Sequence, residues 1–375
     1  MIEISTPAPA VLTEAPVVAE LVRNGFVESV HHASVVVTGP DGSVERAWGD
    51  AQSPMFPRSS NKPMQALAMV RHGLELPDDL LALVCASHSG EPFHLDGVRR
   101  ILAGAGLDES ALQNTPSYPL KESEQHRFIR EGLPPSSIAQ NCSGKHAGML
   151  ATCVVAGWDI STYRDPAHPL QVAIREAVED VAAEPVTALA VDGCGAPVMA
   201  IPLAGLARSF GSIAAAPVRA PDSEQARIAT AIRNAPEFLG GTDRDVTALI
   251  AKTPGLVAKD GAEAVVAVGL ADGAHLAPQE LSGGMARRVA LARALVLDPP
   301  IMLYDEPLTG LDPIACGVVL DLIRRLNDSL GLTSLVITHH VNETLPYADR
   351  AIVVANGGIC FDGTPDALQA SGDPL

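Results

Sequence analysis

The 375-residue sequence has few aromatic side chains, few basic residues and no long apolar run. Phe, Trp and Tyr make up only 3% of a chain that is 47% hydrophobic, so the core has to be built mainly from Ala, Val and Leu. No stretch contains the roughly eighteen consecutive apolar residues that a membrane-spanning helix needs. The net charge of −18 is opposite to the basic surface that nucleic acids and anionic membranes bind. We therefore expect neither membrane insertion nor a nucleic-acid partner.

The N-terminus and the cysteines favour a cytoplasmic protein. Residues 1–20 lack the basic segment of a signal peptide and include Pro7, Pro9, Glu14 and Pro16. The six cysteines are too sparse for a disulfide scaffold, so we expect reduced thiols. Four of them are predicted to be small buried apolar residues: Cys85, Cys153, Cys316 and Cys360.

Hydrophobic periodicity and turn residues predict a mixed α/β chain. Strands are expected at 17–22, 34–38, 186–191, 265–270 and 301–304, and Gly39-Pro40-Asp41-Gly42 is expected to form a hairpin turn. Helices are expected at 63–72, 94–105, 122–132, 145–156, 168–183, 197–210, 223–239 and from about 285 to 297. Residues 78–86 form a buried apolar segment that ends at Ser87.

Chemically active side chains gather in four short clusters, each beside a Gly or Pro. The clusters are 59–63, 87–91, 141–146 and 191–197. The third, Asn-Cys-Ser-Gly-Lys-His, puts a thiol, a hydroxyl, an amine and an imidazole within six residues. Glycine permits the sharp turns that let such side chains converge. The pattern favours an active site built from loops.

Ser59-x-x-Lys62 at a predicted helix start suggests nucleophilic catalysis. A serine hydroxyl reacts only when a base takes its proton, and a lysine one turn away can do this if its pKa is lowered. The alternative is an ordinary helix start, with Ser59 as a capping residue and Lys62 in solvent.

Cys142, Lys145 and Cys194 suggest a metal site. Thiolates suit Zn²⁺, and three protein ligands leave a fourth position for water. Lysine is an unusual ligand because only its neutral amine coordinates. The alternative is a Gly-rich loop whose polar groups satisfy one another. His88 and His146 are expected to be hydrogen-bonded loop histidines.

Five motifs resemble the L-asparaginase II family, the class 3 enzymes of Ser-x-x-Lys type. They are Ser-Ser-Asn-Lys-Pro-Met-Gln-Ala (59–66), Cys-Ala-Ser-His-Ser-Gly-Glu (85–91), Gln-Asn-Cys-Ser-Gly-Lys-His-Ala-Gly-Met (140–149), Val-Asp-Gly-Cys-Gly-Ala-Pro (191–197) and Ala-Lys-Asp-Gly-Ala-Glu (258–263). The resemblance covers about residues 15–273.

That resemblance implies a serine β-lactamase/glutaminase-like fold that hydrolyses L-asparagine to aspartate and ammonia, often as a homodimer. It implies two catalytic pairs, Ser59 with Lys62 and Ser87 with Lys259, and supporting roles for His146 and Asp192. It also implies that Cys142, Lys145 and Cys194 hold zinc. The family continues past Leu270 with a further strand and a closing helix, which this sequence replaces.

Residues 278–366 resemble part of an ABC-transporter ATPase instead. Leu-Ser-Gly-Gly-Met (281–285) resembles the signature loop, with Ser282, Gly283 and Gly284 as its contact residues. Ile-Met-Leu-Tyr-Asp-Glu-Pro (301–307) resembles the Walker B strand, Leu-Thr-Gly-Leu-Asp-Pro (308–313) the D-loop, and Val-Ile-Thr-His (336–339) the switch histidine. The resemblance implies that Asp305 holds Mg²⁺, Glu306 positions water and His339 senses the γ-phosphate.

The phosphate-binding half of such an ATPase is missing. No Gly-x-x-x-x-Gly-Lys-Ser/Thr occurs, because Ala139 and His146 stand at the first and last of these positions around Gly144-Lys145. We therefore expect an amidohydrolase domain at 1–275 and a partial ABC ATPase domain at 276–375, and we expect no binding of ATP and Mg²⁺ without a partner. Two alternatives stay open: an ABC subunit fragment that needs a partner's phosphate loop, and a non-functional fusion.

Overall fold

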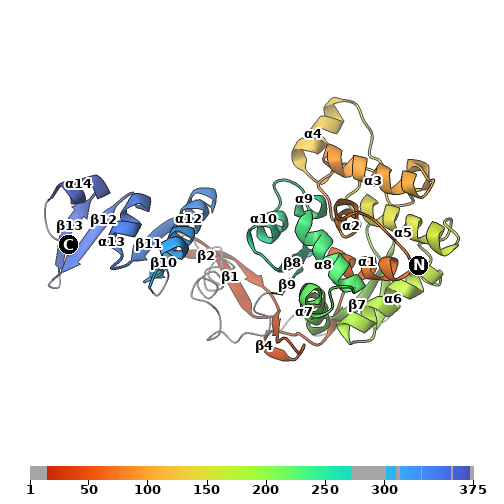
Figure 1. The fold of residues 1–375 in the computed structure, drawn as a ribbon, viewed down its shortest axis with the longest axis horizontal. Helices are drawn as coiled ribbons and strands as arrows, with labels where there is room; N and C mark the ends of the chain where they lie inside the picture. The colour runs from red at the N-terminus through yellow and green to blue at the C-terminus, as the bar shows by residue number, and fades with distance from the viewer. Residues whose placement is uncertain (1–14, 272–300, 310–312, 331, 356–357, 372–375) are drawn as a thin grey trace. The chain divides into compact units, whose positions relative to one another are not determined.

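The computed structural model describes residues 15–271, 301–309, 313–330, 332–355 and 358–371. Contacts within the chain divide it into two compact units, Met1–His275 and Leu276–Leu375. Both units combine strands and helices, as the α/β prediction requires (Figure 1). Among the described helices, none is long and apolar enough to cross a membrane.

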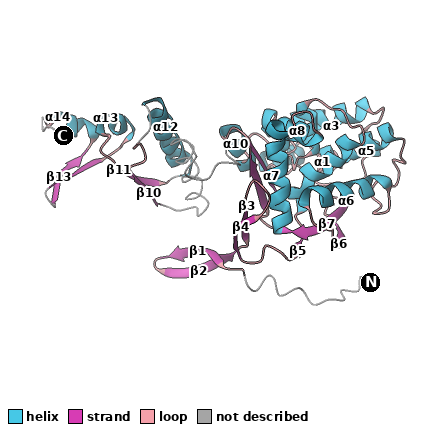
Figure 2. Ribbon diagram, turned by 60° about the horizontal axis from the view of Figure 1, so that its bottom comes forward, coloured by secondary structure: helices cyan, strands magenta, loops and turns pink. Residues whose placement is uncertain are grey.

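The first unit contains short antiparallel sheets. Its strands are β1 (Val17–Arg23), β2 (Phe26–His32), β3 (Val35–Thr38), β4 (Val44–Trp48), β5 (Pro54–Met55), β6 (Ala188–Val191), β7 (Pro197–Pro202), β8 (Leu256–Asp260) and β9 (Val266–Leu270). They pair as β1-β2, β3-β4, β5-β7-β6 and β8-β9. Asn24 and Gly25, both at positive φ, turn β1 into β2 as an Asn-Gly hairpin, which extends away from the helices in Figure 2.

The first unit contains more helical than strand residues. Its helices are α1 (Lys62–Arg71), α2 (Asp78–Val84), α3 (Pro92–Gly104), α4 (Glu122–Arg130), α5 (Ser143–Ala156), α6 (Pro169–Ala182), α7 (Leu203–Arg219), α8 (Glu224–Asn234), α9 (Pro236–Leu239) and α10 (Asp245–Lys252), with 3₁₀ turns at Arg58–Asn61 and Glu109–Ala111. The first nine residues of α1 and the first eleven of α5 are all buried, so these two helices lie inside the core. The polar residues at their N-termini are therefore buried as well.

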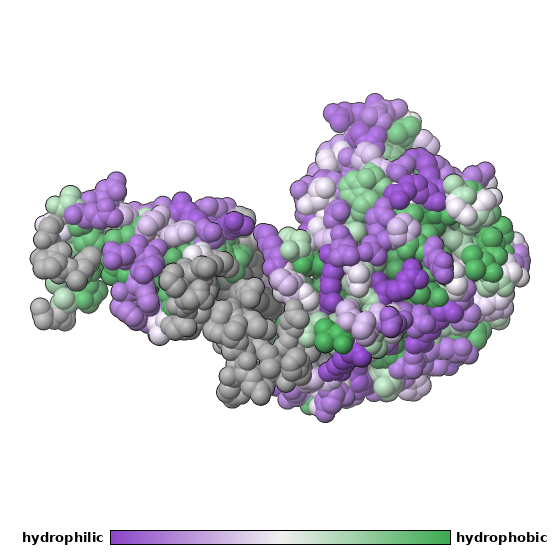
Figure 3. Space-filling model, in the orientation of Figure 1, coloured by the Kyte–Doolittle hydropathy of each residue, from purple (hydrophilic) through white to green (hydrophobic). Residues whose placement is uncertain are grey.

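Glycine lets α5 pack closely against α2. A Cβ on Gly144 would lie 2.3 Å from the Leu83 carbonyl oxygen, and one on Gly148 would lie 2.7 Å from Val84 Cγ2. This close approach brings the start of α5 against the end of α2, where the Ser87 loop begins. Around the core, hydrophilic residues cover most of the face that Figure 3 shows, with apolar residues interspersed.

The second unit has a separate small core. Its described elements are β10 (Ile301–Asp305), α12 (Pro313–Leu330), β11 (Thr333–Ile337), α13 (Val341–Thr344), a 3₁₀ turn at Leu345–Tyr347, β12 (Ala351–Ala355), β13 (Gly358–Gly363) and α14 (Pro365–Ala370). β10 and β11 are parallel and connected through α12, which is the expected βαβ arrangement. Met302, Leu308, Leu320 and Ile323 belong to the buried cluster.

Most predicted elements occur, but several predictions were wrong. Residues 197–202 were expected to be helical and form strand β7, and the helix starts only at Leu203. The predicted helix 223–239 is interrupted at Ala235 between α8 and α9. Strand β8 and helix α10 were not predicted. Cys360 is exposed although a buried residue was expected. The helix predicted at 285–297 lies outside the described residues.

Candidate active site

Lys62 brings three of the four polar clusters together. It starts α1 and is only 1% exposed, so the alternative of a solvated lysine is wrong. Its Nζ donates to Ser87 Oγ at 3.1 Å, to Cys142 Sγ at 3.2 Å and to the carbonyl oxygen of Ala86. These three acceptors surround the amine, which offsets the cost of burying it.

Ser59 lies one turn before Lys62 on the 3₁₀ segment Arg58–Asn61. It is half-buried, and within residues 15–271 no side chain hydrogen-bonds its Oγ. It is not the cap of α1, since Asn61 occupies that position. Of the two serines, Ser87 is therefore the one in hydrogen-bond contact with Lys62, while Ser59 has the more accessible hydroxyl.

Lys259 is fully buried on β8, and its Nζ donates to the carboxylate and the carbonyl oxygen of Asp260, both at 2.6 Å. The pKa of Lys259 is lowered to about 8. Burial is the main cause and the charge of Lys62 adds to it, while the charge of Asp260 opposes both. The expected Ser87–Lys259 hydrogen bond is not among those of the described residues. The end of β8 instead packs against the Ser59 segment: a Cβ on Gly261 would lie 2.7 Å from Ser60 Oγ.

The two cysteines of the candidate metal site lie together in a buried cluster with Ala196. Lys145 Nζ donates to Cys194 Sγ at 3.2 Å. The hydrogen bond between the sulfurs raises the pKa of Cys142 to about 12 and lowers that of Cys194 to about 4. Burial lowers the pKa of Lys145, but the nearby sulfurs outweigh this and raise it overall. The cluster is thus a pair of sulfurs that lie between the Lys62 and Lys145 amines.

The three candidate zinc ligands converge, as a metal site requires. The donor set fits Zn²⁺ if Lys145 releases its proton, because two soft sulfurs and an amine then face one another. No group of three or more His, Cys, Asp and Glu side chains in the described part of the chain could hold a metal, so such a site would depend on Lys145.

His146 and His88 are hydrogen-bonded histidines, as expected. His146 Nδ1 lies 2.7 Å from the Tyr163 hydroxyl, which also accepts the backbone N–H of Gln113. Within the described residues, His146 Nε2 is buried and has no hydrogen-bond partner. Burial, followed by the charge of Lys145, holds the pKa of His146 well below its usual range.

His88 connects two of the loops. Its Nδ1 accepts the backbone N–H of Gly90, and its Nε2 donates to Ser143 Oγ at 2.8 Å. Ser143 Oγ in turn donates to the Ile138 carbonyl. These hydrogen bonds hold the Ser87 loop against the first turn of α5.

Asp192 pairs with Arg58, a residue that the sequence reasoning missed. Arg58 Nε donates to Asp192 Oδ1 at 2.8 Å. Burial raises the pKa of Asp192, but Lys145 and the hydrogen bonds from Gly193 and Arg58 lower it more. Arg58 adopts a positive φ of 52°, a strained conformation for a non-glycine residue. In the sequence, the feature that could have pointed to Arg58 as a site residue is its position directly before Ser59.

In the second unit, the side chains of Glu306 and His339 contact each other. His339 Nδ1 lies 2.9 Å from Glu306 Oε1, and Glu306 follows Asp305 at the end of β10. This hydrogen bond lowers the pKa of Glu306. Ser282, Gly283 and Gly284 lie outside the described residues.

A buried Ser/Lys/Cys site of this kind, on a mixed α/β unit, is what the five motifs of the first unit imply. The sequence model of L-asparaginase II matches residues 19–298. The chain therefore belongs to the L-asparaginase II family.

The C-terminal part is similar to ATP-binding subunits of ABC transporters. The intermembrane phospholipid transport ATP-binding protein MlaF of Haemophilus influenzae is 54% identical over 107 residues, which are 28% of this chain and 40% of that protein. The phosphonates import ATP-binding protein PhnC of Bdellovibrio bacteriovorus is 42% identical over 101 residues, 27% of this chain and 39% of its own. The chain thus spans about two fifths of these relatives.

A solved structure of cbiO1 from Clostridium perfringens, part of an ABC transporter complex, covers 25% of this chain and 37% of its own. Its sequence identity is 32% and its TM-score is 0.24.

Proposed function

We propose that the first unit is an amidohydrolase that releases ammonia from L-asparagine. The observation that carries this proposal is the buried Lys62 amine, which contacts one serine hydroxyl directly and lies one turn from a second. Family membership supports the reaction class. The family resemblance favours a homodimer.

In the proposed reaction, Ser59 Oγ attacks the side-chain amide carbon while its proton passes to Lys62, directly or through Ser87. The proton then goes to the departing amide nitrogen, which leaves as ammonia, and an ester of Ser59 remains. Water, deprotonated by the same lysine, cleaves that ester to give aspartate and restores the serine hydroxyl. Lys259, with its lowered pKa, is a second proton acceptor beside the Ser59 segment.

The Arg58–Asp192 pair suits an amino-acid substrate. Such a substrate carries an ammonium and a carboxylate group on one carbon, and Asp192 and Arg58 provide the complementary charges next to Ser59. His146 Nε2, buried and unpartnered among the described residues, is a further polar group for the substrate. Zinc bound by Cys142, Lys145 and Cys194 would supply positive charge and fix the 142–146 turn.

The test is ammonia release from L-asparagine and L-glutamine by the full chain and by Ser59→Ala and Ser87→Ala. Loss of the reaction in Ser59→Ala alone supports Ser59 as the nucleophile. The hydrogen bond between Lys62 and Ser87 favours Ser87 as the second candidate, and full activity of Ser59→Ala together with loss in Ser87→Ala would select it. No ammonia from the unmodified chain would reject the proposal.

We infer that the second unit does not hydrolyse ATP by itself, because Glu306 and His339 lack a loop that cradles phosphates. An ATPase rate that falls in Glu306→Gln would contradict this. Nucleotide binding only in the presence of a transporter ATPase subunit would support the alternative of a partner-dependent fragment. Insoluble protein without either activity would support a non-functional fusion.

A further inference from the structure

Two hairpins of the first unit lie on the same helix. The hairpin β3–β4 and the hairpin β8–β9 both pack against α7, through β3 and β9. Within the described residues β3 pairs only with β4, and β9 pairs only with β8. One edge of β3 and one edge of β9 therefore carry backbone N–H and C=O groups that have no strand partner among the described residues.

Both strands present the same alternation to α7. On β3, Val36 and Thr38 are half-buried while Val35 and Val37 are exposed. On β9, Ala267 and Gly269 are buried while Val266 and Val268 are exposed. Because a Cβ on Gly269 would lie 2.1 Å from the Phe210 carbonyl oxygen, β9 lies directly on the helix. The two edges thus continue one sheet surface over α7.

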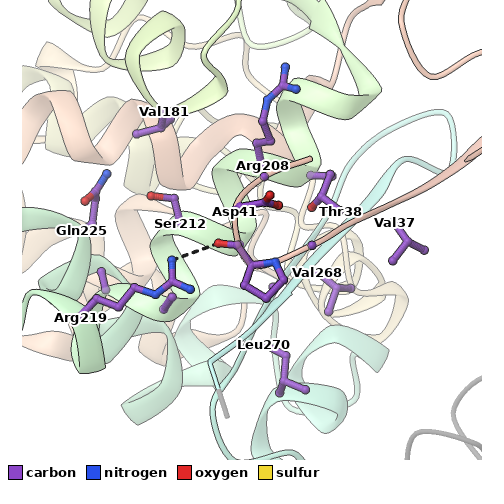
Figure 4. Close-up of a pocket in the computed structure, with 18 of the residues that line it drawn as sticks. Val37, Thr38, Asp41, Val181, Arg208, Ser212, Arg219, Gln225, Val268 and Leu270 are labelled. Atoms are coloured by element: carbon purple, nitrogen blue, oxygen red, sulfur yellow. Dashed lines mark hydrogen bonds between the residues drawn. The ribbon is translucent and has the colours of Figure 1, made fainter. Parts of the chain in front are cut away.

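Both hairpins and α7 line a cavity of about 650 Å³. In Figure 4, Val37 and Thr38 line it from one hairpin, and Val268 and Leu270 line it from the other. Small residues of α7, including Ala207, Gly211 and Ala215, also line it. Small side chains on the helix leave room for the larger side chains of a strand lying between the edges.

The cavity carries a cation without a carboxylate partner. Arg219 donates to the carbonyl oxygen of Pro40 at 3.2 Å (Figure 4), and no acidic side chain of the described chain pairs with it. Arg208 is paired with Glu184, and Asp41 accepts hydrogen bonds from Ser43. An occupant that carries an acidic group would therefore gain an ion pair.

We propose that this slot accepts an extended apolar segment of another polypeptide by β-strand addition, with an acidic residue of that segment beside Arg219. Main-chain hydrogen bonds to β3 and β9 provide the binding energy, and side chains at alternate positions fill the cavity over α7. The occupant has β-branched residues at its centre, because both neighbouring strands present valines. The slot does not involve the amidohydrolase site.

The probe is the peptide Val-Ile-Val-Ile-Val-Asp with a fluorescein at its N-terminus, titrated with the full chain at low salt. We expect saturable binding by fluorescence anisotropy. A peptide with proline in place of the second isoleucine lacks a backbone donor for the ladder and should bind at least about tenfold more weakly.

The variant Gly211→Leu fills the cavity from a helix position where a Cβ meets no atom within 4 Å, so it leaves the fold intact. It should weaken binding by about tenfold or more through steric exclusion. The matched control is Gly104→Leu, another helical glycine with open space, which should bind like the unmodified chain. Arg219→Gln should weaken binding roughly two- to fivefold, and less at high salt.

Failure of the peptide to bind the unmodified chain, or equal affinity for Gly211→Leu, would overturn the proposal. A different result would be a dimeric protein that does not bind the peptide and that Gly211→Leu converts into monomers. This result would show that a second copy fills the slot, and it would reject a foreign strand. Unchanged thermal unfolding of the variants verifies that they are folded.

Discussion

Lys62 is buried because the helix that it starts is buried on every side. Its amine is then held by acceptors from two other loops, which include Ser87 and Cys142. The sequence predicted that Ser59 and Lys62 share one helical turn, and they do. It could not predict that the side chain turns toward Ser87, because spacing along the chain does not fix the direction of a four-carbon side chain.

Replacing Lys62 by methionine should abolish most of the proposed reaction. Methionine has a similar length and suits a buried position, but it cannot take a proton, so kcat should fall by about 10²–10⁴-fold. The measurement is ammonia release at saturating asparagine, with the exposed Lys252→Met as control. A Lys62→Met protein that keeps more than half of its activity would contradict a role for this amine.

The pH dependence of the reaction should report Lys259. Only its neutral amine accepts a proton, and its pKa is lowered to about 8. The value of kcat/KM should therefore rise with pH, with a midpoint at about pH 8. The charge of Asp260 raises this pKa, so Asp260→Asn should move the midpoint to lower pH. The check is a pH–rate profile for both proteins. An unchanged midpoint in Asp260→Asn would assign the titration to another group.

At the scale of elements, two glycines distinguish close packing from open space. Gly144→Ala places a methyl group against the Leu83 carbonyl and should destabilise the first unit by about 1–3 kcal/mol. Gly211→Ala has free space on α7 and should be neutral or stabilise by up to about 1 kcal/mol. Chemical unfolding measures both. Equal stability of the two variants would contradict the close approach of α5 and α2.

The elements that the sequence predicted well have a one-sided hydrophobic pattern. α3 and α6 alternate between buried and exposed positions, and their periodicity was sufficient. β7 is buried at all six positions, so no alternation marks it as a strand and its apolar run merges with that of α7. The sequence also located the chemically active loops. Their contacts, such as Arg58 with Asp192, depend on packing between distant segments.

At the scale of the whole molecule, each unit has its own core. Leu320 is buried in the second unit, so Leu320→Ala should destabilise that unit by about 2–5 kcal/mol. Ammonia release should be unaffected, because every proposed catalytic residue lies in the first unit. Calorimetry and the ammonia assay test this together. A parallel loss of the catalytic rate would show that the two units fold as one.

The β1–β2 hairpin has a consequence for handling the protein. It exposes Leu21, Val22, Phe26 and Val30, and within the described chain its outer edges have no strand partner. Such ribbons tend to join edge to edge into aggregates, and mutual repulsion at a net charge of −18 opposes this. Salt shortens the range of that repulsion to about 3 Å at 1 M. Light scattering should therefore increase with ionic strength, and placing a lysine at Val22 should keep the solution clear.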